Sequence, residues 1–220
     1  MTNVLFIAEG GFGKGLGHIR ESLSLAKRIK DTKEDVHITI LVLSDEHFDL
    51  SCNIEVCSDL DTRIVSTNEK TRIENVISKI EPNVIIFEMH VLRKEFLEHI
   101  VKRFPNVAYV AIGNLRTNLP RNVGEYVDIV VNYNFGESFE SKRYFDKKTN
   151  TLYFQGPKYF ILDPSLERYR RKNLISRSSL SASHILISFG GSDPSNLTVR
   201  SLKALLDIDT QLNKITVVLG

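Results

Sequence analysis

The segment at residues 8–20 constrains the fold most strongly, because it joins an apolar run to an amphipathic one through five glycines in residues 10–17. Residues 4–7 are continuously apolar, which predicts a buried parallel strand. Residues 19–29 repeat apolar side chains every three or four positions, which predicts a helix. Glycine lets a ligand approach the backbone closely, and a helix start presents unpaired N–H groups. This loop therefore predicts a site for an anionic or phosphorylated ligand.

Four residues of this loop are candidates for the site. Gly15 and Gly17 would allow close contact with the ligand, Arg20 would pair with its charge, and His18 would transfer a proton, since imidazole titrates near neutral pH. The alternatives are glycines that serve packing alone, a solvated histidine, and an arginine that only forms a surface ion pair. The glycine spacing fits the dinucleotide-binding fingerprint G-x-G-x-x-G only in part. Asp45 is a weak match to the acidic residue that this fingerprint places after the second strand. Binding of a nicotinamide cofactor is therefore a less favoured alternative.

Strand-like and helix-like runs alternate through residue 132. The strands are apolar on both faces, which predicts an α/β fold with a parallel sheet covered by helices. Residues 134–151 are polar and predict a loop, and residues 152–154 form a short apolar piece. Further strands are expected at residues 36–43, 53–56, 83–87, 106–112 and 128–132, and helices at 68–80 and 92–104.

A second half begins after a basic, serine-rich run at residues 167–183. We expect strands at 184–189 and 215–219 and a helix at 197–206. One such unit cannot bury both faces of its strands, so we expect it to be truncated or completed by another chain, with truncation favoured. The predicted domains are 1–155, a Rossmann-like domain, 156–183, an interdomain linker, and 184–220, the start of a second Rossmann-like domain.

The loop at residues 190–196 repeats the arrangement of the first loop. Glycines again lie between a strand and a helix, and the N–H groups at the helix start would hold a diphosphate. Asp193 or Ser195 would cap the helix, and capping alone is the alternative interpretation. Two glycine-rich loops, one in each half, favour a shared ligand cleft.

Composition narrows the class of protein. The formal net charge of +2 argues against nucleic acid as a partner, and no apolar run approaches the length of a membrane span. Cys52 and Cys57 are too few for a disulfide framework and are expected to be reduced thiols. No His/Cys/Asp cluster has metal-ligand spacing. We expect a cytoplasmic protein with a small-molecule substrate, no metal and no cofactor; the sequence leaves the oligomeric state open.

Three stretches, in chain order, resemble one family. They are G-L-G-H-I-R at residues 15–20, G-P-K-Y-F-I-L-D-P at 156–164, and I-S-F-G-G-S-D-P-S-N-L-T at 187–198. The chain resembles the PseG/SpsG group, which comprises UDP-2,4-diacetamido-2,4,6-trideoxy-β-L-altropyranose hydrolases of pseudaminic acid synthesis and spore coat polysaccharide biosynthesis proteins. This group is distantly similar to MurG-type GT-B glycosyltransferases.

The resemblance implies a GT-B architecture, with two Rossmann-like halves around a cleft. The first half would hold the sugar with His18 at the anomeric centre, and the second half would bind UDP. The implied reaction is attack of water on the anomeric carbon of a UDP-linked amino sugar, with UDP as leaving group. The binding residues implied in the linker and second half are Tyr159, Gly190, Gly191, Ser192, Asp193, Asn196 and Thr198.

The chain departs from this family at two positions. Glu88 stands where the family has an aspartate after the fourth strand, and His90 beside it is either loop or part of the site. Asn114 follows the fifth strand, where the family has an Asp-Asp pair. Asn114 and residues 132–134 would supply neutral donors and acceptors, or only line a loop. A GT-B glycosyltransferase and a catalytically impaired nucleotide-sugar-binding protein are therefore alternatives.

Overall fold

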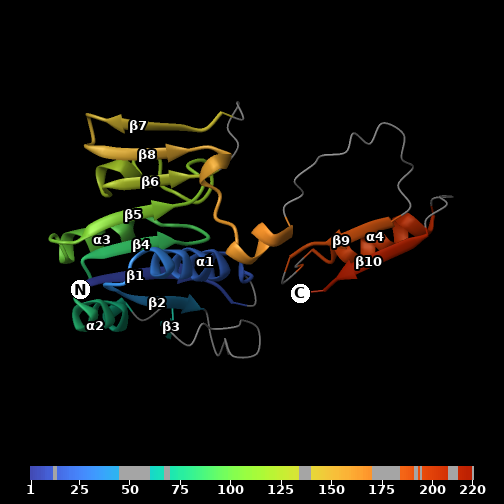
Figure 1. Ribbon diagram of the computed structural model, residues 1–220, viewed down its shortest axis with the longest axis horizontal. Helices are drawn as coiled ribbons and strands as arrows, with labels where there is room; N and C mark the ends of the chain where they lie inside the picture. The colour runs from blue at the N-terminus through green and yellow to red at the C-terminus, as the bar shows by residue number, and fades with distance from the viewer. Residues whose placement is uncertain are drawn as a thin grey trace.

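The computed structural model describes residues 1–11, 14–44, 60–66, 70–133, 140–169, 184–190, 193, 195–207 and 213–219. Its main body is an eight-stranded sheet with the order β3-β2-β1-β4-β5-β6-β8-β7 (Figure 1). Only β7 runs antiparallel to its neighbour. The strands are β1 (Thr2–Glu9), β2 (Val36–Ser44), β3 (Asp61–Ser66), β4 (Val84–Glu88), β5 (Ala108–Ile112), β6 (Ile129–Asn132), β7 (Lys142–Asp146) and β8 (Thr151–Gln155).

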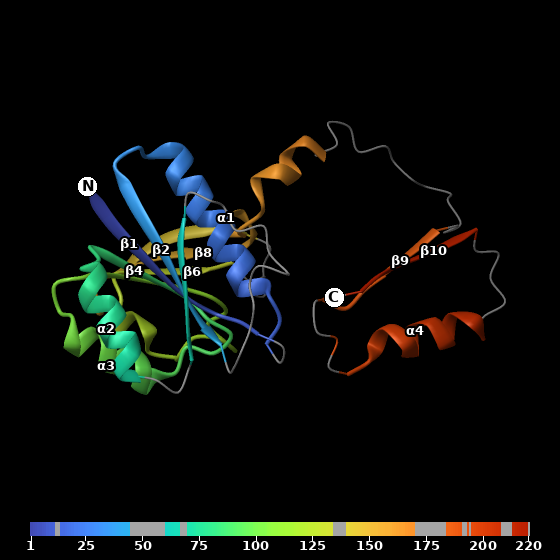
Figure 2. The same ribbon diagram turned by 90° about the horizontal axis from the view of Figure 1, so that it is seen from below.

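Helices cover both faces of this sheet (Figure 2). One face packs against α1 (Gly17–Thr32), whose Ile19 and Ala26 are fully buried. The other face packs against α2 (Lys70–Ile80) and α3 (Lys94–Arg103). Because helices lie on both sides, the central strands are buried almost throughout, which confirms the predicted α/β class.

The strand order places β1 and β4 side by side, so the connections from these two strands leave in opposite directions along the sheet. In open α/β sheets, ligands bind at this switch point, outside the carboxyl ends of the strands. Gly10 brings α1 close to β1 here, because a Cβ atom at this position would collide with the side chain of Ile19. The start of α1 therefore lies at the switch point.

The second half forms its own two-stranded parallel sheet, from β9 (His184–Ser188) and β10 (Lys214–Val218), with α4 (Leu197–Leu206) between them in the chain. Leu186 on β9 is 65% exposed. The exposure of this apolar side chain agrees with the expectation that one βαβ unit cannot cover both faces of its strands.

Two sequence predictions were incomplete or wrong. Residues 142–146 were predicted as loop but form the edge strand β7, whose Tyr144 stacks on Tyr153 of β8 at 4.9 Å between ring centroids. Edge strands carry charged, exposed side chains, so β7 lacked the apolar signal of a strand. The other edge strand, β3, was likewise not predicted. The strand expected at residues 53–56 lies outside the described residues, and so do Asp45, Cys52 and Cys57.

The predicted linker begins with structure that contacts the first half. Two 3₁₀ turns, η3 (Pro157–Tyr159) and η4 (Pro164–Tyr169), follow β8. Between them, the ring of Phe160 meets Tyr133 edge-on at 5.2 Å, and Ile161 packs against the core on the α1 face. The domain boundary at residue 155 stays a prediction.

Candidate functional site

The β1–α1 loop is closed by a pair of backbone hydrogen bonds between two glycines. The N–H of Gly15 donates to the carbonyl of Gly11 at 2.8 Å, and the N–H of Gly11 donates back at 3.2 Å. Both residues have positive φ, +146° at Gly11 and +73° at Gly15, which glycine adopts without strain. Helix α1 then begins at Gly17, and no described side chain caps it. Its first N–H groups therefore face the loop, as the prediction of an anion site requires.

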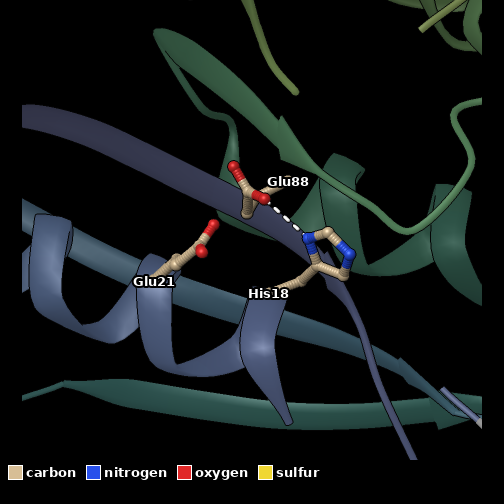
Figure 3. A group of neighbouring side chains, drawn as sticks. All are labelled: His18, Glu21 and Glu88. Carbon is tan, nitrogen blue, oxygen red and sulfur yellow. Dashed lines mark hydrogen bonds and ion pairs between the residues drawn. The ribbon is translucent and has the colours of Figure 1, made fainter. Parts of the chain in front are cut away.

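His18, the second residue of α1, contacts the buried carboxyl group of Glu88. His18 Nδ1 lies 2.7 Å from Glu88 Oε1 (Figure 3). Glu88 is the last residue of β4 and points to the α1 face, and its side chain is fully buried. The His18 side chain is 16% exposed. The structure thus brings together two candidate residues that lie 70 positions apart in the sequence.

A third titratable residue, Glu21, completes the group. It lies one helical turn after His18 on α1, and one polar atom from each of His18, Glu21 and Glu88 lies within 4.8 Å of the others. Three ligand atoms at this spacing could hold one divalent cation. The hydroxyl of Tyr133, which follows β6, donates to Glu21 Oε2 at 3.4 Å.

Burial and like charge shift the protonation of this group. Burial raises the pKa of Glu88 to about 8. Burial and the neighbouring charge of Glu88 raise the pKa of Glu21 to about 7. Burial lowers the pKa of His18, against the opposing charges of Glu21 and Glu9. At neutral pH the imidazole is therefore neutral, and the two carboxyl groups hold about one proton between them.

A neutral imidazole in this position can act as a base. If Nδ1 carries the hydrogen and donates it to Glu88 Oε1, then Nε2 has a free electron pair. Figure 3 shows Nε2 pointing away from both glutamates. His90, which the sequence left as either loop or site, lies beside it: the two imidazole centroids are 5.9 Å apart and His90 is exposed.

The remaining candidates of the first half lie outside this group. Arg20 is exposed, and Gly17 has open space where a Cβ would stand. Asn114 Oδ1 accepts a hydrogen bond from the N–H of Arg116 at 2.8 Å and so stabilises the turn after β5. Tyr159 packs edge-on against Phe154 at 5.2 Å. The contacts of Asn114 and Tyr159 are structural, and their predicted roles in binding stay predictions.

In the second half, Asp193 caps α4 as the sequence predicted. Its two carboxylate oxygens accept hydrogen bonds from the N–H groups of Leu197 and Thr198 at 2.8 and 2.9 Å. These hydrogen bonds lower the pKa of Asp193. The two N–H groups are therefore already paired, and a diphosphate at this helix start would have to use other groups or displace Asp193.

The other candidates around α4 are only partly described. Gly190 is exposed with φ +76°, Asn196 precedes α4 with φ +50°, and the side chain of Thr198 is buried. Gly191 and Ser192 lie outside the described residues. A cleft shared by His18 and these loops stays a prediction.

Replacing Asp193 with alanine is expected to lower the free energy of unfolding of the second half by about 1 kcal/mol, because two helix N–H groups lose their acceptor. Asp193→Asn keeps one accepting oxygen but puts an NH2 donor in place of the other, so it should lose about half of that amount. Urea denaturation of both variants measures the difference. Equal losses in the two variants would show that the carboxylate charge, and not the cap, stabilises this loop.

Sequence reasoning missed Glu21. The signal was its spacing: a residue three positions after His18 on a helix lies on the same face, one turn away. That spacing alone does not indicate a site, because the importance of Glu21 depends on the strand order that places Glu88 against α1. Tyr133 was noted only as one of several neutral polar residues, and its contact with Glu21 depends on the position of β6 in the sheet.

No family model matches the chain. A protein of Methanocaldococcus jannaschii that is described as uncharacterized is 32% identical over 217 residues, which are 99% of this chain and 42% of that protein. The spore coat polysaccharide biosynthesis protein SpsG of Bacillus subtilis is 24% identical over 212 residues, 92% of this chain and 54% of SpsG. The chain thus spans about half the length of these relatives.

A solved structure shares the fold. The crystal structure of Acinetobacter baumannii MurG matches all of this chain, over 67% of the MurG chain, with a TM-score of 0.52 and 12% identity. The chain therefore has an α/β fold of the GT-B type with a mostly parallel central sheet. Among the described residues, no helix is both long and apolar enough to cross a membrane.

Proposed function

We propose that this chain provides the sugar-binding half, and part of the nucleotide-binding half, of an enzyme that hydrolyses a UDP-linked amino sugar for the synthesis of a surface polysaccharide or nonulosonic acid. The observation that carries the proposal is the His18–Glu88 pair at the switch point of the sheet. A neutral histidine held by a buried carboxyl group, beside a helix start that no described side chain caps, is suited to activate water next to an anionic substrate.

The comparisons support the same class of substrate. SpsG, by its name, takes part in the biosynthesis of a polysaccharide, and the three motifs of the PseG/SpsG group occur in this chain in order. The GT-B type of fold supplies two halves between which a nucleotide and a sugar would lie.

In the proposed reaction, His18 Nε2 removes a proton from a water molecule as its oxygen attacks the anomeric carbon. The bond between that carbon and the diphosphate oxygen breaks, and its electron pair leaves with UDP. The free sugar gains the hydroxyl group of the water, and His18 later releases the proton to solvent. Positive ends of backbone N–H groups would stabilise the charge that develops on the diphosphate.

The experiment incubates the intact protein with UDP-linked diacetamido sugars and with UDP-N-acetylglucosamine in ¹⁸O-labelled water. We expect release of UDP without any acceptor, with the label in the anomeric hydroxyl and not in UDP, because the carbon–oxygen bond breaks. Phosphorus NMR follows UDP, and mass spectrometry locates the label.

Two other outcomes would each replace this proposal. UDP release that requires an added acceptor alcohol would identify a glycosyltransferase. Binding of UDP-sugar in calorimetry without any turnover would identify a catalytically impaired binding protein. Label in UDP would instead show attack at phosphorus, which the position proposed for His18 does not explain.

A further inference from the structure

One oxygen of the buried carboxyl group at the end of β4 has no hydrogen-bond partner among the described residues. Glu88 Oε1 contacts His18 Nδ1, whereas Glu88 Oε2 is buried and has no hydrogen-bond partner among the described residues. An ionised, buried carboxylate with an unpaired oxygen is strongly unfavourable. A proton held at Oε2 would remove this cost.

Among the described residues, Glu21 is a candidate donor to this oxygen, because its carboxyl group lies in one cluster with His18 and Glu88. Glu21 is the neighbouring group on α1 whose carboxyl interacts with Glu88, and Tyr133 donates its own hydroxyl to Glu21 instead.

We propose that Glu21 is a positioning residue that shares one proton with Glu88 at Oε2. This shared proton keeps Glu88 Oε1 as the acceptor for the His18 Nδ1–H. His18 Nε2 therefore carries no proton. The three residues form a relay from a carboxyl pair to an imidazole. The raised pKa values of both glutamates agree with a proton held between them.

The tautomer of His18 depends on that proton. With Glu21 as partner at Oε2, Glu88 Oε1 can only accept, so the hydrogen of the neutral imidazole stays on Nδ1. Without Glu21, Glu88 gains its proton alone and donates it to Nδ1, which moves the hydrogen of the imidazole to Nε2. His18 would then present a donor where hydrolysis needs a base. The catalytic part of this inference rests on the proposed function, while the tautomer does not.

The first test measures the tautomer directly in the unaltered protein. Two-bond proton–nitrogen NMR spectra of ¹⁵N-histidine-labelled protein at pH 7.5 should show His18 as the Nδ1–H tautomer, assigned by the signal lost in His18→Asn. An Nε2–H tautomer would overturn the proposal. The spectra are repeated with EDTA and with added Zn²⁺ or Mn²⁺, because a cation bound by the three residues would shift or broaden the His18 signals and would equally overturn it.

The second test replaces Glu21. Glutamine at this position keeps a donor for Glu88 Oε2 but has no proton to lose, whereas alanine removes the donor. We expect Glu21→Gln to retain the Nδ1–H tautomer, and Glu21→Ala to shift it toward Nε2–H. Glu74→Gln is the matched control, since Glu74 pairs with His99 at 2.7 Å on the exposed surface. Unchanged tautomers in both Glu21 variants would contradict the proposal.

Activity provides a third readout. In the unaltered protein, kcat should fall as the pH rises through the range where the pair loses its shared proton, because two adjacent carboxylates then repel each other. This alkaline decline should move up by at least about one pH unit in Glu21→Gln. Glu21→Ala should lower kcat by about 10- to 100-fold with little change in KM, part of what a general base contributes.

A purely structural Glu21 would leave the pH profile of Glu21→Gln identical to that of the unaltered protein, which would refute its positioning role. If no substrate is turned over at all, the proposed function fails but the tautomer measurements still decide the relay. If turnover occurs and the tautomer is wrong, the relay fails while the hydrolase stands.

Discussion

His18→Asn is expected to lower the rate of UDP release by about 100- to 10,000-fold, the usual contribution of a general base. Asparagine can still donate a hydrogen bond to Glu88 from the position of Nδ1, but it has no atom in place of the basic Nε2. The variant should therefore fold normally and bind the nucleotide sugar with similar affinity. Stopped assays of UDP release at substrate saturation measure the loss in kcat.

His99→Asn is the control for this substitution. His99 lies on α3 and is about half exposed, and its Nε2 contacts Glu74 on the surface. Surface pairs of this kind contribute little to stability, so His99→Asn should keep the activity of the unaltered protein within about twofold. A loss in His18→Asn no greater than in His99→Asn would remove His18 from the reaction.

The central part of the fold was predictable because its signal is local. Continuous apolar runs identified β1, β2, β4 and β5, and helical periodicity with a following proline located α2 and α3, each to within about two residues. The edge strands β3 and β7 were not predicted, because they carry polar side chains and depend on pairing with a partner strand elsewhere in the chain.

The candidate site was predictable in part for the same reason. The glycine-rich loop marked His18 locally, whereas Glu88 was proposed only because the chain resembles a family that has an aspartate after the fourth strand. Their contact at 2.7 Å follows from the pairing of β1 with β4, which no local pattern reveals. Glu21 was missed because its significance arises only once Glu88 faces α1. Asp193 was predicted both to cap α4 and to adjoin a diphosphate, and the structure shows the cap.

Replacing Phe87 with alanine is expected to lower the free energy of unfolding of the first half by about 3–5 kcal/mol, a large part of the stability of a typical domain. Phe87 on β4 is fully buried. It stacks on Tyr109 at 6.1 Å and meets Phe96 edge-on at 6.3 Å between ring centroids. Alanine would remove both ring contacts and leave a cavity against α3. Urea denaturation followed by circular dichroism measures the loss.

Phe145→Ala provides the comparison, because Phe145 lies on the edge strand β7 and is 53% exposed, so its loss should change the stability by less than about 0.5 kcal/mol. Similar losses in both variants would show that the β4 side of the core does not stabilise the first half.

Successive side chains of a strand point to opposite faces, so Phe87 points away from α1 while Glu88 points toward it. The folded fraction of Phe87→Ala should therefore keep the pH profile of the unaltered protein, which Glu21→Gln should not. The two substitutions separate the stability of β4 from the protonation of the residue at its end.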